Sequence, residues 1–413
     1  MPLTLRCYGA AARLAQPGLR LWLARRVARG REDAARLAER FGAASRERPP
    51  GRLIWVHAAS VGETVSVLPL IAELAREGAV LLTTGTLTSA ALAAERLPAG
   101  AIHQFVPLDV PDWVEAFLDH WRPAAAAFVE SEIWPNMLAA LARRGIPAML
   151  VNGRISARSG ARWRLMPDAA RELLGRFRWI AAQSPQDAAR FRSLGAARVE
   201  NPGNLKFAAP ALPDAEGRAA LAALLPGPRV LAAATHPGEE EHVIAAHRRL
   251  LREFPGLATI IVPRHPARGA AVAALASGLS AAMRSGGQEP EPGGIYIADT
   301  LGELGLFYRL CPIAFIGGSL VPIGGHNMLE AARLGCAVLT GPHTENFAEA
   351  VAVLRGADAL EIVPEGGALG PVLRRLLADP ARAAAMGEAG RAAADRYNDL
   401  PGRLARRILE SAA

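Results

Sequence analysis

Three glutamates stand where a carboxylate could act on a substrate. Glu63 follows the segment WVHAASVG (residues 55–62), and Glu130 and Glu132 follow the apolar run AAAAFV. At the start of a helix, behind a loop of small residues, Glu63 would direct an ionised carboxylate at a bound hydroxyl, as a general base does. Two carboxylates on one side of the chain are costly unless they are hydrogen-bonded or face polar ligand groups. The helix dipole alone could instead explain Glu63 in the first turn of a helix, and Glu132 could cap the helix that it precedes.

The only lysine of the chain is a fourth candidate. Of the 47 basic residues, 46 are arginine, and the exception is Lys206 within NPGNLKFAAP (residues 201–210). Because arginine serves almost everywhere that a cation is needed, this position favours a compact ammonium group. We therefore interpret Lys206 as a functional residue, the alternative being a lysine retained by chance.

The second half of the chain contains charged or glycine-rich loops that follow apolar runs. A helix that starts near Asn327 would hold a phosphate on its backbone N–H groups, and Glu330, one turn in, is well placed for ribose hydroxyls. Arg264 and His265 follow another apolar run, and neither a Walker lysine nor a GxGxxG motif is present. The loops are ATHPGEEEHVI (234–244), VPRHPAR (262–268), ADTLGELGLFY (298–308), IGGSLVPIGGHNMLEAARLG (316–335) and GPHTENF (341–347).

These loops belong to a repeated pattern of short apolar runs and longer helical segments. Such alternation indicates βαβ units and a parallel sheet. The pattern stops at a Pro- and Ala-rich segment (residues 208–218) and then begins again, so we predict an α/β protein with two doubly wound domains that face a central cleft. Ligands of such sheets bind at the carboxyl ends of the strands. The predicted strands are RLIWVHAAS, AVLLTTGT, AAAAFVES, AMLVNGR, WIAAQS, RVLAAATH, ATIIVPRH, GIYIAD, IAFIGG and AVLTG.

The composition narrows the set of partners. The 413 residues carry a formal net charge of +8 and a pI near 10.3, which favours anionic partners such as nucleic acid, a membrane face or a phosphorylated substrate. Three widely separated cysteines exclude a disulfide framework, and no metal-binding spacing is present. No run approaches the ~20 apolar residues of a membrane span. Residues 1–32 form a basic amphipathic segment that could lie on an anionic membrane or pack on its own domain.

Taken in order, the motifs resemble those of the bacterial 3-deoxy-D-manno-octulosonic acid (Kdo) transferases of lipopolysaccharide assembly. The resemblance implies a GT-B glycosyltransferase with two Rossmann-like domains. It also implies transfer of Kdo from CMP-Kdo to lipid IVA (tetraacyldisaccharide 1,4'-bisphosphate), with inversion at the anomeric carbon. The matching segments are WVHAASVGE, ESEIWPN, GNLKF, VPRHP, DTLGEL, GGSLVPIGGHNMLEAA and GPHTENF.

The resemblance also implies a role for each candidate residue. Glu63 would accept the proton of the acceptor hydroxyl, and Glu130 and Lys206 would stabilise the transition state. We expect neither a metal nor another cofactor, because a nucleoside monophosphate needs less charge compensation than a diphosphate. The expected CMP-binding residues are Pro263, Arg264, Leu301, Gly302, Glu303, Asn327, Met328, Leu329 and Glu330.

The expected organisation has four parts. Residues 1–32 would associate with the membrane, 33–207 bind the acceptor, 208–217 form a linker and 218–413 bind CMP, with a last helix that could cross back to the first domain. The expected partners are CMP-Kdo, lipid IVA and the anionic cytoplasmic face of the bacterial inner membrane, without nucleic acid.

Two other classes of function remain open at this point. Another GT-B transferase of cell-envelope synthesis could use a UDP-sugar, and titration with cytidine and uridine nucleotides would separate it from the first interpretation. A non-enzymatic basic module would need basic stripes with interleaved aromatic residues, but aromatic residues make up only 5% of the chain.

Overall fold

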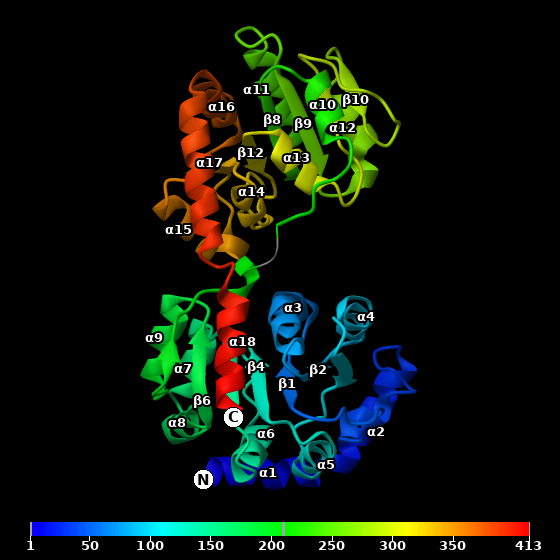
Figure 1. Ribbon diagram of the computed structural model, residues 1–413, viewed down its shortest axis with the longest axis vertical. Helices are drawn as coiled ribbons and strands as arrows, with labels where there is room; N and C mark the ends of the chain where they lie inside the picture. The colour runs from blue at the N-terminus through cyan, green and yellow to red at the C-terminus, as the bar shows by residue number, and fades with distance from the viewer. Residues whose placement is uncertain (1, 209–210, 413) are drawn as a thin grey trace. The chain divides into compact units, whose positions relative to one another are not determined.

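A computed structural model describes residues 2–208 and 211–412. The chain divides into two compact units, one formed by Met1–Ala209 with Tyr397–Ala413 and the other by Pro210–Arg396 (Figure 1). Within the predicted linker 208–217, positions 209 and 210 lie outside the described residues.

The first unit contains a parallel sheet of seven strands in the order β3-β2-β1-β4-β5-β6-β7. All five residues of β1 and all five of β4 are buried, as expected for a parallel sheet covered by helices on both faces. The strands are β1 (Leu53–His57), β2 (Ala79–Thr84), β3 (Ala101–Phe105), β4 (Ala125–Val129), β5 (Ala148–Gly153), β6 (Phe177–Ala182) and β7 (Val199–Glu200).

The strand order places a topological switch between β1 and β4. The chain runs from β1 outward to β2 and β3 and then returns to pair β4 with the other side of β1. In open parallel sheets the ligand site lies beyond the carboxyl ends of the strands at such a switch. The segments that start at Ala58 and Glu130 leave the sheet at this point.

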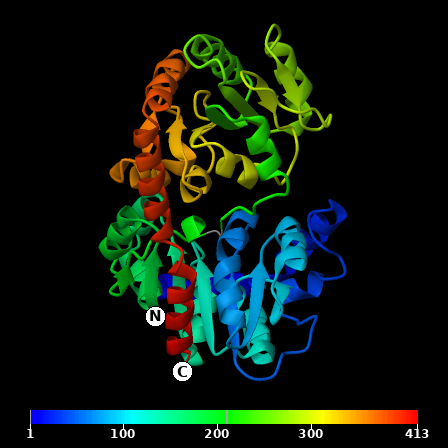
Figure 2. The same cartoon turned by 45° about the horizontal axis from the view of Figure 1, so that its top comes forward.

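Helices flank the sheet of the first unit, and the last helix of the chain is one of them. α18 buries Leu404 and Ile408 in the same apolar cluster as Ile54 of β1 and Val67 of α3, and Figure 2 shows it in red beside the first sheet. The helices are α1 (Leu3–Leu14), α2 (Gln16–Ala28), α3 (Val61–Ala75), α4 (Leu87–Arg96), α5 (Pro111–Trp121), α6 (Pro135–Arg143), α7 (Ala157–Trp163), α8 (Pro167–Gly175), α9 (Pro185–Ser193) and α18 (Leu400–Ser411), with 3-10 turns η1 (Leu37–Phe41) and η2 (Leu205–Ala208).

The two N-terminal helices are packed on one side and open on the other. α1 contacts α5 and α6 through Leu5 and Gly9, and α2 buries Leu23. Leu14 and Trp22 are among the large apolar side chains that these helices leave exposed. No helix within the described ranges is long and apolar enough to cross a membrane.

The second unit repeats the architecture with a seven-stranded parallel sheet in the order β10-β11-β9-β8-β12-β13-β14. Its switch lies between β8 and β12. The strands are β8 (Arg229–Thr235), β9 (Ala258–Pro263), β10 (Ala281–Met283), β11 (Ile295–Ile297), β12 (Ile313–Ile316), β13 (Ala337–Thr340) and β14 (Leu360–Ile362). Its helices are α10 (Arg218–Leu224), α11 (Glu240–Leu250), α12 (Gly269–Leu275), α13 (Leu304–Leu310), α14 (Leu329–Arg333), α15 (Ala348–Gly356), α16 (Leu369–Ala378) and α17 (Pro380–Asp395).

Candidate active site

Glu63 stands in the first turn of α3, and its carboxylate is tied to the loop before the helix. The backbone N–H of Ala59 donates to Oε2 at 2.8 Å and the Ser60 hydroxyl donates to Oε1 at 2.9 Å, while Ser60 Oγ accepts from the Glu63 N–H. The pattern resembles a capping box in which the carboxylate binds the N–H of Ala59 in place of that of the N-cap residue Ser60, so Glu63 also helps to fix the start of α3. Burial raises the pKa of Glu63, these two hydrogen bonds act in the opposite direction, and the nearby charges of Glu132 and Glu130 raise it further.

Glu130 leaves β4 with φ of 55°, a conformation that is uncommon for a residue other than glycine and is often found at functional sites. Its side chain is 12% exposed, and Oε1 lies 2.8 Å from Nζ of Lys206, which is 45% exposed. The structure thus brings together two candidates that are 76 positions apart in the sequence.

The segment that carries Lys206 is fixed by two asparagines. The buried Asn152, at φ 53°, accepts the N–H of Leu205 on its Oδ1 at 2.9 Å. Oδ1 of Asn204 accepts the N–H of Lys206 itself at 3.0 Å. Lys206 therefore starts from a defined backbone position beside Glu130.

Glu132 has partners of its own. Its Oε2 lies 3.3 Å from Nε2 of the buried His57 and accepts the indole N–H of Trp134 at 2.6 Å. Burial raises the pKa of Glu132, but the hydrogen bonds with His57 and Trp134 outweigh it and hold the pKa below its usual value. Asn136, two residues after Trp134, binds elsewhere: its side-chain amide donates to the carbonyl of Asp109.

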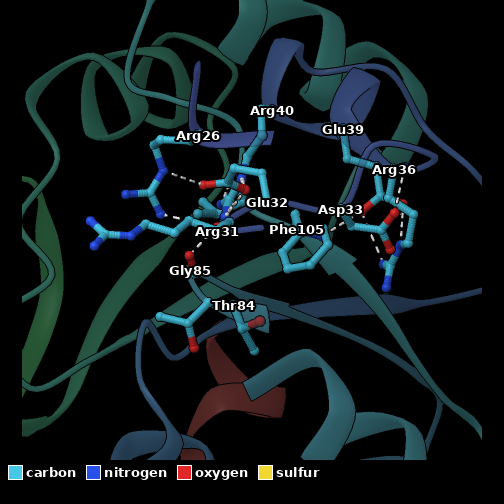
Figure 3. Close-up of polar contacts among 12 residues, drawn as sticks. Arg26, Arg31, Glu32, Asp33, Arg36, Glu39, Arg40, Thr84, Gly85 and Phe105 are labelled. Carbon is cyan, nitrogen blue, oxygen red and sulfur yellow. Dashed lines mark hydrogen bonds and ion pairs between the residues drawn. The ribbon is translucent and has the colours of Figure 1, made fainter. Parts of the chain in front are cut away.

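A buried ion network, which the sequence analysis missed, joins Arg26, Glu32 and Arg40 (Figure 3). Glu32 and Arg40 are each 4% exposed and form an ion pair at 3.0 Å, and Arg26 donates to the other oxygen of Glu32. Burial lowers the pKa of Arg40, while the charge and hydrogen bond of Glu32 raise it.

This network reaches the Glu63 carboxylate through the backbone. Arg40 donates to the carbonyl of Gly85 at 2.7 Å, and the Gly85 N–H donates to the carbonyl of Ala59 at 3.0 Å. Ala59 is the residue whose N–H binds Glu63. A Cβ added at Gly85 would lie 3.0 Å from the Ala59 carbonyl oxygen, so a glycine suits this close approach.

At the switch point of the second sheet the buried carboxylate of Glu239 organises two loops. It accepts backbone N–H groups of His236, Gly318, Ser319 and Leu320 at 2.7 to 2.9 Å. The sequence marked three consecutive glutamates here without indicating that Glu239 and Glu240 are buried and Glu241 is exposed. Next to this carboxylate, Nε2 of His236 lies 2.8 Å from Nε2 of His326.

Among the predicted CMP-binding residues, Asn327 and Glu330 contact each other. Nδ2 of Asn327 donates to the Glu330 carboxylate at 3.0 Å, and burial raises the pKa of Glu330. Pro263 ends β9 and Arg264 is exposed immediately beyond it. Met328 and Leu329 are buried, so they have only backbone groups to offer a ligand.

The remaining predicted CMP-binding residues, Leu301, Gly302 and Glu303, are consecutive and form the turn before α13. Gly302 has φ of 85° and the side chain of Leu301 is exposed. Glu303 forms an ion pair with Arg284, whose hydrogen bond holds the pKa of Glu303 below its usual value.

α14 begins at Leu329, near Asn327 as predicted, and Oδ1 of Asn327 accepts the N–H of Leu329 in the turn that leads into the helix. α13 begins at Leu304, so Leu301, Gly302 and Glu303 precede that helix. Asn327 therefore presents its amide from a turn.

In residues 2–208 and 211–412 there is no group of three or more His, Cys, Asp or Glu side chains arranged to hold a metal ion.

The two parallel, doubly wound sheets form a GT-B type fold, and solved structures share this fold. A glycosyltransferase from Rickettsia africae matches 87% of this chain and 99% of its own, with 12% identity and a TM-score of 0.56. MurG of Acinetobacter baumannii matches 87% of this chain and 100% of its own, with 13% identity and a TM-score of 0.54.

Sequence comparison gives the family. Residues 35–209 match the family model described as 3-deoxy-D-manno-octulosonic-acid transferase (kdotransferase). A 3-deoxy-D-manno-octulosonic acid transferase of Bordetella pertussis is 36% identical over 93% of this chain and 94% of its own. A probable mitochondrial one from Arabidopsis thaliana is 38% identical over 86% of this chain and 84% of its own. The chain belongs to the Kdo transferase family, and it is a glycosyltransferase that transfers Kdo.

Proposed function

We propose that this enzyme transfers Kdo from CMP-Kdo to lipid IVA, with inversion at the anomeric carbon. The observation that carries the proposal is the grouping of Glu63 and the Glu130–Lys206 pair at the switch point of the first sheet. A base and a cation beside a ligand position are what this substitution requires.

In the proposed step Glu63 accepts the proton of an acceptor hydroxyl. The hydroxyl oxygen forms a bond to the anomeric carbon of Kdo while the bond from that carbon to the phosphate oxygen breaks, and CMP leaves with the electron pair. A carboxylate whose pKa is raised by burial is a stronger base than an exposed one, which suits removal of a hydroxyl proton.

Lys206 supplies positive charge to the sugar carboxylate or the departing phosphate, and Glu130 fixes the ammonium in place. The ion pair at 2.8 Å and the two asparagines behind Lys206 support this role, because charge held in position before the reaction needs no reorganisation during it.

The second unit holds the CMP moiety. Arg264 is exposed after β9 and suits the phosphate, and the Asn327–Glu330 pair suits the ribose hydroxyls. Pro263, Leu301, Gly302 and Glu303 complete the nucleotide site, with backbone groups at Met328 and Leu329. We propose that no metal takes part.

The enzyme works on the cytoplasmic face of the inner membrane, with α1 and α2 on the anionic lipid surface. Exposed Leu3, Leu14, Leu21 and Trp22 alternate there with arginines, a combination that suits the interface. Replacing Leu14 and Trp22 by serine should reduce co-sedimentation with phosphatidylglycerol vesicles. The same change at Leu275 and Ile323 of the second unit, which are also exposed, is the control.

The central experiment measures Kdo transfer from enzymatically generated CMP-Kdo to lipid IVA in the presence of EDTA. We expect product from the wild type and a large loss with Glu63→Gln. CMP and UMP titrations of the same protein test the donor half separately. Failure of the folded wild type to transfer to lipid IVA would contradict the acceptor assignment, and tighter binding of UMP than of CMP would favour the UDP-sugar alternative.

A further inference from the structure

The segment that runs from Arg154 through α7 forms an arginine-rich surface. The segment itself contains no acidic residue that could neutralise these arginines. From Ile133 to Pro167 the chain contains no aspartate or glutamate. Arg154, Arg158, Arg162 and Arg164 lie in this stretch and all four are exposed. In the part of the chain that the structure describes, none of their side chains forms a hydrogen bond or an ion pair.

The start of this surface is anchored directly to Glu130. The N–H of Arg154 donates to the carbonyl of Glu130 at 3.1 Å, and the Ser131 hydroxyl donates to the carbonyl of Arg154 at 2.7 Å. Oδ1 of the buried Asp187 accepts the N–H of the next residue, Ile155, at 2.9 Å. The backbone is thus held from two sides, and the Arg154 side chain is free to bind a ligand.

The arginines continue along α7, and exposed apolar side chains follow them in the chain. Arg158 and Arg162 are four residues apart within α7, so they share one face of the helix. Leu165 and Met166, just beyond α7, are 81% and 47% exposed. Unpaired cations followed by exposed apolar side chains fit a ligand that carries phosphate next to acyl chains.

The carboxylates around Glu63 would repel an anionic acceptor, so such an acceptor needs a positively charged surface nearby. The charges of Glu130 and Glu132 act on Glu63, and of these three carboxylates it is Glu130 that pairs with the ammonium group of Lys206. A bisphosphorylated acceptor would be repelled there unless its phosphates lay on nearby cations. Arginine binds phosphate through paired N–H groups and is therefore better suited than lysine to hold a phosphate in a fixed orientation.

We propose that Arg154, Arg158 and Arg162 bind a phosphate group of the lipid acceptor and so position its hydroxyl beside Glu63. This inference rests on the proposed transfer to a bisphosphorylated lipid and adds the part of the chain that recognises its phosphates. The arginines bind the acceptor molecule itself rather than the headgroups of the surrounding membrane.

The test compares two charge-matched double variants. Arg158→Gln/Arg162→Gln removes two cations from α7, and Arg52→Gln/Arg96→Gln removes two exposed cations from the opposite, amino-terminal edge of the sheet. Each enzyme receives lipid IVA and the same lipid with both phosphates removed, in neutral detergent micelles. Arg154→Gln is a third variant.

We expect the α7 double variant and Arg154→Gln each to raise KM for lipid IVA about ten- to hundredfold, the usual loss for a charged hydrogen bond. The donor KM and the transfer to the dephosphorylated lipid should stay at wild-type values, as should the melting temperature, since these side chains are exposed. The control variant should match the wild type on both acceptors.

Three outcomes would overturn the inference: no difference between the α7 and control variants on lipid IVA, an equal loss on the dephosphorylated lipid, or a defect confined to assays with phosphatidylglycerol vesicles. The last result would assign the arginines to membrane headgroups. Equilibrium binding of labelled lipid IVA without donor tests the arginines even if the wild type transfers nothing, so failure of the proposed reaction remains distinguishable.

Discussion

The ammonium nitrogen of Lys206 lies 2.8 Å from a carboxylate oxygen of Glu130. The two residues come from different elements, since Glu130 follows β4 at a positive φ and Lys206 sits in the turn η2. In a chain with 46 arginines and one lysine, the lysine is thus the cation that pairs with the carboxylate at the end of the central strand β4.

Replacing Lys206 should reduce turnover with little effect on stability. We expect Lys206→Ala to lower kcat by about 10²- to 10³-fold, the loss typical of a positioned electrostatic group. Lys206→Arg should also lower it, because the larger guanidinium cannot take the same place. The side chain is 45% exposed, so the melting temperature should change little. Arg76→Ala, which breaks the exposed Arg76–Glu73 pair, is the control, and equal effects of the two alanine variants on kcat would contradict the assignment.

The pH dependence of the reaction should report on the Glu63 loop. A general base works only when deprotonated, so kcat should fall as the pH drops through the pKa of Glu63. Because burial raises that pKa, the fall should begin at a higher pH than for an exposed glutamate. Ser60→Ala removes a hydrogen bond that lowers the pKa and should move the acid limb further toward neutral pH.

A helix-cap change of the same kind provides the control for Ser60→Ala. Thr86 caps α4 by accepting the N–H of Ser89, and Thr86→Ala should cost about 1 kcal/mol of stability, as any lost cap does. It should leave the pH profile of kcat in place. An acid limb that Ser60→Ala does not move, or moves toward lower pH, would rule out Glu63 as the base.

The buried Glu32–Arg40 pair should be important for the stability of the first unit. Glu32→Gln leaves the Arg40 guanidinium buried without a full counter-charge, and we expect a loss of about 3–5 kcal/mol in the free energy of unfolding. Glu73→Gln removes a carboxylate from an exposed pair and should cost less than about 1 kcal/mol. Urea unfolding of both variants measures the difference, and equal losses would contradict this account of the network.

Glu239 should support nucleotide binding without touching the nucleotide. In Glu239→Gln one carboxylate oxygen becomes an NH2 group that faces backbone N–H groups, so we expect destabilisation by about 1–3 kcal/mol for each donor left unpaired. The loops after β8 and β12 should then bind CMP more weakly in calorimetry. Glu241→Gln, an exposed change two residues away, should leave CMP affinity unchanged, and a Glu239→Gln protein with normal affinity would refute this role.

The sequence predicted most of the fold because the central strands are continuous apolar runs. β1 and β4 are of this kind, whereas β3 (AIHQF) carries His103 and Gln104 and was not predicted. Those polar residues are tolerated because they bind in the structure, His103 to Thr84 and Gln104 to Trp121. Such compensation is invisible in a local pattern.

The candidate residues of the first unit could be found from their types and positions, but their partners could not. Nothing near Lys206 in the sequence points to Glu130, and the Glu32–Arg40 network depends on the carbonyls of Gly85 and Val106, far along the chain. α14 starts at Leu329, near the predicted position, and the Asn327 side chain fixes that start by accepting the N–H of Leu329, which has no acceptor within the helix. Side-chain hydrogen bonds of this kind decide local boundaries that periodicity alone does not reveal.

The position of α18 has a consequence for the synthesis of the protein. This helix belongs to the first unit and covers the apolar side of α3, the helix that carries Glu63, although residues 210–396 precede it in the sequence. Chains are synthesised from the N-terminus, and domains usually fold as they emerge. Here the side of α3 that α18 covers lacks this helix until the whole second unit has been translated. The half that begins first is finished last.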